Sequence, residues 1–317
     1  MNVKINSKDA GITVREYLRG RLGFSSAMLK KLKFTEGGIT VNGGFVTVRH
    51  ILEEGETLSL RCEDTPEDTS PYIIPSDAKV EIIYEDEFIT AVNKPPDMPA
   101  HPSYRHRDDT VANALAARYR NAPYVFRPVN RLDRDTSGVM LTANTRLASY
   151  QMYRLMTEGK IRKSYIAVLD GVPDRKSGKI ESYIRRKGDS IIEREECTES
   201  EGGKYALTEF HVIYSNGQKS LVLAHPVTGR THQLRVQFAG IGCPIAGDSM
   251  YGAESGLIGR QALHAVRTEF VHPFTGEMMC LTAPVPEDIK TLISEEFGDM
   301  DASLKAFICR GEQRCSD

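Results

Sequence analysis

Hydrophobic residues near the start of the chain recur first at helical spacing and then at strand spacing. Val14, Tyr17 and Leu18 follow Thr13, which together with Glu16 matches the capping box found at helix starts. In such a box, a hydroxyl and a carboxylate satisfy backbone amides that the first helical turn leaves without partners. This pattern predicts a first short helix.

A second short helix is predicted to begin at Ser25 or Ser26. Its inward face would hold three apolar residues: Met28, Leu29 and Leu32. Its outward side would hold three lysines: Lys30, Lys31 and Lys33. Alternating residues before Asn42-Gly43 then predict a hairpin, and the alternation within residues 55–60 predicts a further strand.

From residue 80 onward, the alternation of apolar and polar positions predicts a chain rich in strands. Residues 82–92 indicate a strand, an acidic turn and a second strand. The run 139–143 is also typical of a strand. Further alternating strands are predicted at three places: 164–169, 205–214 and 220–224.

Two helices are predicted among these strands. Residues 108–120 indicate a helix that starts at an aspartate cap. One of its faces would hold three apolar residues: Val111, Ala114 and Leu115. After residue 225 a turn leads into the other helix, on which His232 and Arg235 are three residues apart and share a face. An opposing apolar stripe would hold three residues: Leu234, Phe238 and Ile241.

The composition is that of an ordinary globular chain with about two domains. The chain has 317 residues, of which 40% are hydrophobic and 26% charged, and a domain takes roughly 100–200 residues. It has no apolar run of the roughly 18 residues that a membrane helix needs, and no apolar segment typical of a secretory signal. Six cysteines without a CxxC pair argue against a disulfide scaffold and a zinc ribbon. We therefore expect a cytoplasmic protein that is not bound to a membrane.

Charge is distributed unevenly, although the net charge is only −2. Residues 1–62 hold ten basic and six acidic side chains, a balance that suits either a local nucleic-acid surface or an ordinary solvated one. Residues 63–79 hold five acids, one lysine and three prolines, which is the composition of a solvated linker. We therefore predict a first domain over 1–62, a linker over 63–79, a larger domain over 80–297 and a tail over 298–317.

The densest polar stretch of the chain runs from Asn130 to Gly138 and holds two arginines, two aspartates and two hydroxyls. These residues alone allow two interpretations. One is a salt-bridged turn, in which the arginines pair with Asp133 and Asp135; the other is a functional loop. Tyr165 alone would be interpreted as a core aromatic and His232 as a residue on a helix face, so single residues do not decide.

Taken together, the segments resemble the RluA family of RNA pseudouridine synthases. The similarity rests on VNKPPDMPAHP, RLDRDTSG, KSYIAVLDG and HPVTGRTHQLRVQF, followed by GDSMYG at 247–252. It extends from about residue 80 to residue 290 and implies an α+β catalytic domain with a mixed, mostly antiparallel central sheet. One departure is Asn130, where many members have histidine, and we interpret it as a tolerated change.

The first domain resembles the small RNA-binding module first described in ribosomal protein S-four, with two short helices followed by a hairpin. In such modules the second helix and the following loop meet the RNA backbone. The resemblance therefore implies phosphate contacts from Lys30, Lys31 and Lys33, which would set affinity more than sequence choice.

The resemblance also implies the chemistry. Pseudouridine formation breaks the N1–C1′ bond, turns the uracil and rejoins it through carbon 5, so neither a cofactor nor a metal is expected. Asp133 matches the family's essential aspartate, which acts as a nucleophile or removes a ribose proton. Arg235 matches the arginine that pairs with this aspartate. Tyr165 matches a tyrosine beside the uracil, which could act as a phenol or a phenolate.

Further residues are expected to hold the substrate. Arg131 matches a residue that enters the space left when the target uridine is flipped out of its stack. Additional substrate contacts are expected from four residues: Asn130, Arg134, Thr231 and His232.

We expect a monomer that acts on RNA without a protein partner. Large-subunit ribosomal RNA is the favoured substrate, because family members that act on tRNA often lack the first domain. Two alternatives are a synthase acting on tRNA and an RNA-binding protein of this fold with little catalysis. A glycoside hydrolase using Asp133 and Asp135 is disfavoured, because residues two apart on a strand face opposite sides and the chain has no tryptophan for sugar stacking.

Overall fold

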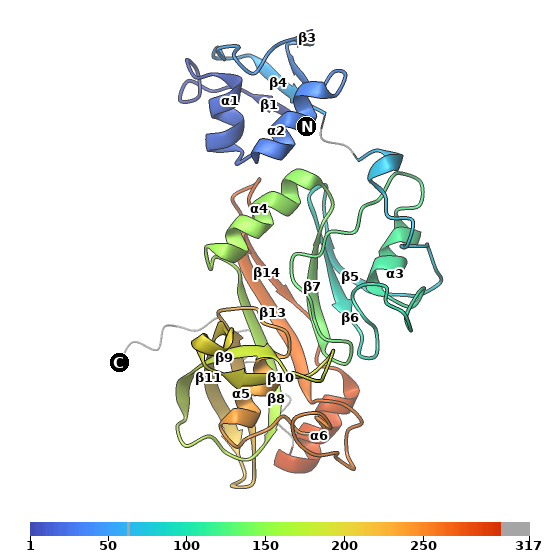
Figure 1. Cartoon of the computed structure of the whole chain (residues 1–317), viewed down its shortest axis with the longest axis vertical. Helices are drawn as coiled ribbons and strands as arrows, with labels where there is room; N and C mark the ends of the chain where they lie inside the picture. Colours follow the sequence, from blue (N-terminus) through green and yellow to red (C-terminus); the bar gives the residue numbers. More distant parts are fainter. Residues whose placement is uncertain (62–63, 299–317) are drawn as a thin grey trace.

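The computed structural model describes residues 1–61 and 64–298, and these form two separate β-sheets (Figure 1). A four-stranded sheet with the order β1-β4-β2-β3 lies within the first 60 residues, which we call the head. A ten-stranded sheet forms the centre of the remainder, which we call the body. The predicted tail lies outside the described residues apart from Gly298.

The head is built from short elements, in which the predicted helices and hairpin are present. Its elements are β1 (Asn2–Lys4), α1 (Val14–Glu16), the π-helical turn η1 (Tyr17–Arg21), α2 (Ser26–Phe34), β2 (Ile39–Val41), β3 (Gly44–Phe45) and β4 (Thr57–Leu60). The capping box predicted at Thr13 and Glu16 is formed, and the Ser25 side chain caps α2. Leu29 and Leu32 are buried, as the apolar pattern predicted.

The body sheet has the strand order β10-β9-β11-β12-β8-β13-β7-β6-β5, and β14 pairs with β13. Its strands are β5 (Glu81–Glu85), β6 (Ile89–Lys94), β7 (Ser137–Ala143), β8 (Arg162–Asp170), β9 (Ser177–Arg186), β10 (Arg194–Cys197), β11 (Lys204–Ser215), β12 (Lys219–Pro226), β13 (Leu263–Val271) and β14 (Met278–Thr282). Neighbouring strands are antiparallel except β7 and β13, which are parallel. The mixed, mostly antiparallel sheet implied by the sequence is confirmed.

The middle of this sheet is buried on both faces. On β7, Val139 and Leu141 belong to one hydrophobic cluster together with Met152 of α4 (Arg146–Thr157). Met140, between them, belongs to the main cluster on the other face, which α3 (Val111–Arg118) also joins. The alternation of buried and exposed residues predicted for β8 is wrong, because seven consecutive residues of that strand are buried. Burial of the sheet on both faces explains this run.

The two helices predicted in the body are present, but their ends differ from the predictions. The N-cap of α3 is Thr110 rather than an aspartate. The helix after the predicted turn, α5 (Gln233–Gly240), begins one residue later than assumed, because His232 occupies its N-cap in the left-handed conformation (φ 57°). Ile241 follows the end of α5 and is 41% exposed, so the predicted apolar stripe loses its third member. The sixth helix, α6 (Glu287–Phe297), packs into the main cluster.

The joint between head and body is held by ion pairs, so the prediction of a solvated linker is wrong for its first part. Asp64 accepts a 2.8 Å hydrogen bond from Arg127, and both side chains are nearly buried. Asp68, in the short 3-10 helix η2 (Pro66–Asp68), binds Lys31 of the head at 2.6 Å and Arg146 at the start of α4 at 2.8 Å. The acidic residues of this stretch therefore act as connectors rather than as solvated charges.

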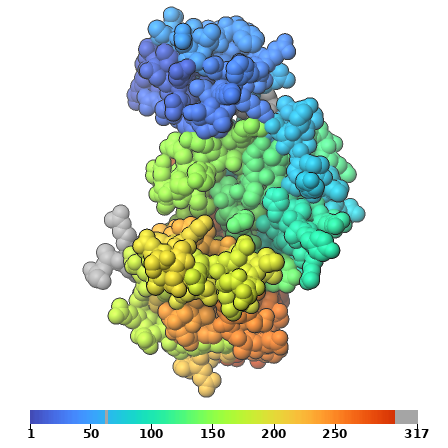
Figure 2. All heavy atoms as spheres, viewed as in Figure 1, coloured from blue at the N-terminus to red at the C-terminus, as the bar shows by residue number. Residues whose placement is uncertain are grey.

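The head rests directly on α4 (Figure 2). Leu147 of α4 belongs to the hydrophobic cluster of the head, and the Gln151 amide donates to the Leu22 carbonyl. All three lysines of α2 are exposed, and Lys31 is in addition paired with Asp68 at this joint, so its phosphate contact stays a prediction. Within residues 1–61 and 64–298, no helix is both long and apolar enough to cross a membrane.

Candidate active site

Asp133 lies in the loop that leads into β7, and buried side chains hold this loop from behind. Lys94, at the end of β6, is fully buried and donates three hydrogen bonds to the carbonyl groups of Pro95, Met98 and Arg134 at 2.7–2.8 Å. Arg260 donates to the Asp135 carbonyl at 2.8 Å. Because these donors come from segments distant in sequence, the conformation of the loop is fixed by the fold.

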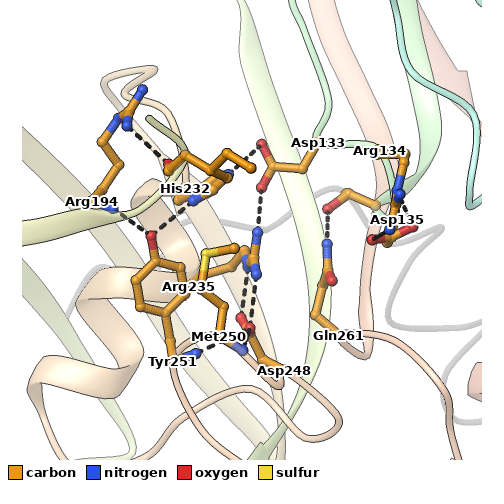
Figure 3. Close-up of polar contacts among 12 residues, drawn as sticks. Asp133, Arg134, Asp135, Arg194, His232, Arg235, Asp248, Met250, Tyr251 and Gln261 are labelled. Atoms are coloured by element: carbon orange, nitrogen blue, oxygen red, sulfur yellow. Dashed lines mark hydrogen bonds and ion pairs between the residues drawn. The ribbon is translucent and has the colours of Figure 1, made fainter. Parts of the chain in front are cut away.

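The carboxylate of Asp133 faces Arg235 of α5 (Figure 3). Arg235 Nη1 lies 3.5 Å from Asp133 Oδ2, and the arginine side chain is only 8% exposed against 25% for the aspartate. The guanidinium also makes a bidentate contact with Asp248, through Nε at 2.6 Å and Nη2 at 2.8 Å. A buried second carboxylate thus fixes the arginine and leaves one edge of its fork for Asp133.

His232 approaches the other oxygen of this carboxylate. Its Nε2 lies 4.0 Å from Asp133 Oδ1, and its Nδ1 lies 2.8 Å from the hydroxyl of Tyr251. The same hydroxyl accepts from the Arg194 backbone N–H at 2.7 Å, so its own hydrogen is available for Nδ1. Burial lowers the pKa of His232, so the ring is neutral near pH 7. This arrangement favours the tautomer with the ring proton on Nε2, toward Asp133.

Tyr165, on β8, is buried in the main hydrophobic cluster, and it lies close enough to Asp133 for the charge of that carboxylate to affect its pKa. Burial and, to a lesser extent, the negative charge of Asp133 raise the pKa of Tyr165. The side chain therefore remains a neutral phenol at neutral pH. Of the two forms that the sequence left open, the phenolate is the one that this environment disfavours.

The remaining predicted substrate residues do not all converge on Asp133. Asn130 is buried, and its amide accepts from the Leu141 N–H at 2.8 Å while the NH2 group faces the Val139 carbonyl at 3.5 Å. This side chain therefore fastens the loop to β7, and its substrate contact stays a prediction. Arg131 and Thr231 are exposed.

The salt-bridged turn considered for residues 130–138 is present only in part. Arg134 pairs with Asp135 at 3.1 Å and with Asp97 at 3.5 Å, so it is engaged within the protein. Asp133 takes no part in this local pairing and faces Arg235 instead (Figure 3). Asp133 and Asp135 lie in the loop before β7 and not on a strand. The argument against a glycoside hydrolase that placed them on opposite faces of a strand is therefore wrong.

Sequence reasoning missed three residues of the site: Lys94, Asp248 and Tyr251. The last two belong to GDSMYG, where an acid and an aromatic residue stand among glycines soon after α5. The Tyr251 ring also stacks on Arg235, with 5.0 Å between the guanidinium carbon and the ring centre. Among the described residues, no group of three or more His, Cys, Asp or Glu side chains is placed to hold a metal ion.

Replacing Lys94 with methionine should destabilise the protein, because three partly buried carbonyl groups would lose their donor. Each buried group left without a partner costs about 1–3 kcal/mol. Burial lowers the pKa of Lys94 to about 7. The unfolded chain therefore binds one more proton than the folded protein between about pH 7 and 10, so this lysine's contribution to stability grows as the pH rises.

Chemical denaturation of wild type and Lys94→Met at pH 7 and pH 9 measures this effect. The difference in the free energy of unfolding should be larger at pH 9 than at pH 7. Equal stability of the two proteins at both pH values would contradict the role given to Lys94.

Known proteins are similar to this chain in sequence and in fold. A family model described as RNA pseudouridylate synthase matches residues 89–240, a range that contains Asp133, Tyr165 and Arg235. The uncharacterised RNA pseudouridine synthase YjbO of Bacillus subtilis is 37% identical over 287 residues, covering 90% of this chain and 99% of that protein. Ribosomal large subunit pseudouridine synthase D of Pseudomonas aeruginosa is 33% identical over 275 residues, covering 82% of this chain and 84% of that one.

Among solved structures, human RNA pseudouridylate synthase domain containing 1 aligns with a TM-score of 0.53 at 29% sequence identity. The alignment covers 65% of this chain and 83% of the human one. The sequence similarity extends over nine tenths of this chain, and the fold of the body is shared with the human protein. This chain belongs to the family of RNA pseudouridine synthases, which are isomerases of uridine in RNA.

Proposed function

We propose that this protein converts uridines of large-subunit ribosomal RNA to pseudouridine, with Asp133 as the catalytic carboxylate. The observation that carries the proposal is the ion pair at 3.5 Å between the partly exposed Asp133 and the buried Arg235. A nearby cation favours the ionised carboxylate, which is the form needed to attack the sugar or to remove a ribose proton.

The other residues around Asp133 support the positioning of the substrate. The N1–C1′ bond breaks, the uracil turns and carbon 5 bonds to C1′. The proton on carbon 5 then passes to solvent, and N1 takes up a proton. Tyr165 offers a neutral ring against which the uracil can lie, and its phenol can donate a hydrogen bond. Arg131 is an exposed residue of the same loop and can enter the space left by the flipped uridine.

The choice of ribosomal RNA rests on two features. Relatives named ribosomal large subunit pseudouridine synthase D, from Pseudomonas aeruginosa and Vibrio cholerae, align over 82% and 84% of this chain. The head adds an exposed pair of lysines, Lys30 and Lys33, on one helix. We further expect the enzyme to act in the cytoplasm as a monomer.

Pseudouridine mapping of total RNA from cells with and without the gene tests the substrate. Loss of one or more sites in large-subunit ribosomal RNA, restored in vitro by the purified protein, is the expected result. Sites lost only from tRNA would replace ribosomal RNA by tRNA as the substrate. An unchanged map, together with RNA binding by the purified protein, would favour a binding protein with little catalysis.

Replacing Lys30 and Lys33 together with glutamine should weaken RNA binding and reduce its salt dependence. Removing one lysine–phosphate pair lowers the slope of log affinity against log salt by about 0.7–0.9, so removing two predicts a reduction of about 1.4–1.8. Lys8→Gln is a control, because Lys8 is an exposed lysine of the head outside α2. Filter binding at several salt concentrations gives the slopes, and equal slopes for the double variant and wild type would remove α2 from the RNA interface.

A further inference from the structure

A second lysine of the body, Lys163, is buried without any partner for its charge. It lies on β8 two residues before Tyr165, so the two side chains point to the same face of the sheet. The residue is 7% exposed, and burial lowers its pKa to about 8. Among residues 1–61 and 64–298, no acid pairs with its ammonium group and no acceptor bonds to it, in contrast to Lys94 with its three carbonyl acceptors.

The ammonium group of Lys163 lies next to Gly229, a position where neither packing nor backbone conformation requires glycine. A Cβ atom on Gly229 would lie 3.7 Å from Lys163 Nζ, at ordinary contact distance, and would meet no other atom within 4 Å. Gly229 does not adopt a positive φ, so its backbone conformation does not require glycine. Gly229 is exposed. The space that this missing side chain would fill is therefore open and lies beside Lys163 Nζ, and we call it the notch.

The notch lies close along the chain to residues of the candidate active site. Gly229 belongs to the turn that leads into α5, and α5 carries Arg235 behind His232. Lys163 is separated from Tyr165 by about 7 Å along the strand, at roughly 3.3–3.4 Å per residue. A ligand in the notch would therefore lie on the same face of the sheet as the uridine that Tyr165 is proposed to face.

An uncompensated buried cation is costly unless a ligand supplies the opposite charge. The anion that an RNA-modifying enzyme meets at its site is the phosphodiester of its substrate, and a lysine binds a phosphate as a point charge. We infer that Lys163 Nζ, reached through the notch at Gly229, binds a backbone phosphate of the substrate RNA beside the target uridine. This inference rests on the proposed function, because it takes the substrate to be RNA bound at Asp133.

Two variants test the site from opposite sides. Lys163→Met removes the charge and keeps the apolar stem, and Gly229→Ala fills the notch with a methyl group for which the protein has room. Lys163→Met should bind ribosomal RNA about 10- to 100-fold more weakly, the range for one hydrogen bond to a charged group, and its salt slope should fall by about 0.7–0.9. Gly229→Ala should weaken binding with Lys163 still present. Lys179→Met is the control, because Lys179 is an exposed lysine already paired with Glu209.

Binding, rate and thermal stability are measured for each protein with the same ribosomal RNA. The inference predicts that affinity falls more than the single-turnover rate at saturating RNA, and that Lys163→Met melts no lower than wild type. A lower melting temperature with an unchanged salt slope would give Lys163 a purely structural role and overturn the phosphate site. Affinities equal to wild type for both variants would overturn it as well, even if the wild type forms pseudouridine.

Replacing single phosphodiesters of the RNA by an uncharged analogue identifies the phosphate that Lys163 binds. In a synthetic stem-loop carrying a mapped target, single methylphosphonate substitutions remove one charge at a time. At one linkage near the target, the substitution should weaken binding to wild type but leave binding to Lys163→Met unchanged. A wild-type protein that neither binds nor modifies RNA would overturn the proposed function together with this inference. An active enzyme whose RNA binding does not change when Lys163 is replaced would overturn this inference alone.

Discussion

Asparagine in place of Asp133 is expected to lower the rate of pseudouridine formation by at least about 10²–10⁴-fold, the range for loss of a positioned proton-transfer group. An amide is neither a nucleophile nor a base, whichever step the carboxylate performs. The fold and RNA affinity should change little, because Asp133 makes no hydrogen bond that holds the loop from behind, whereas Lys94 and Arg260 do.

Single-turnover rates and RNA affinity of wild type and Asp133→Asn measure this effect. Asp133→Glu is an informative companion, since it keeps the charge and displaces the carboxylate by one methylene group. A rate for Asp133→Asn within a few-fold of wild type would remove Asp133 from the chemistry.

Methionine in place of Arg235 is expected to have the second large effect, on stability and on rate. Arg235 is the charged partner of the fully buried Asp248, and removing one partner of a buried ion pair costs about 3–5 kcal/mol. Asp133 and Asp248 would then share the site with no cation between them, which favours proton uptake by one carboxylate. The rate near neutral pH should fall, and part of it should return as the pH rises and this proton is released.

A second variant separates the two effects. Arg235→Met combined with Asp248→Asn leaves no lone buried charge at position 248, so stability should recover in part while the rate remains low. Thermal melting and single-turnover rates from pH 6 to pH 9 provide the measurements. A pH profile with the wild-type shape and weaker RNA binding as the main defect would mean that Arg235 holds RNA instead of Asp133.

The sequence predicted the elements that short-range patterns determine. The Thr13 capping box, the Asn42-Gly43 turn and the strands around 82–92 follow from local hydrogen bonding and alternation. Family landmarks also predicted that Asp133 and Arg235, which are 102 residues apart, would meet. The alternation predicted for β8 was wrong, because a strand that is covered on both faces does not alternate between apolar and polar residues.

The interactions that the sequence could not predict join segments distant along the chain. Lys94 donates to one carbonyl group of the Asp133 loop, that of Arg134, which lies 40 residues away, and nothing near Lys94 marks it as buried. Asp68 resembles a linker acid until the fold brings Lys31 and Arg146 to it. The motif predicts a substrate contact for Asn130 but does not predict the hydrogen bond that its amide accepts from the backbone of β7.

Release of the hydrogen on carbon 5 tests the role of Asp133 most directly, because that hydrogen leaves only if the uracil is rejoined through carbon 5. RNA transcripts labelled with tritium at carbon 5 of uridine are incubated with wild type, Asp133→Asn and Asp135→Asn, the last being a neighbouring carboxylate paired with Arg134. We predict tritium release by wild type and by Asp135→Asn, and none above background by Asp133→Asn at RNA concentrations where it is bound. Release by Asp133→Asn at the wild-type rate, or loss confined to Asp135→Asn, would contradict the assignment of Asp133 as the catalytic carboxylate.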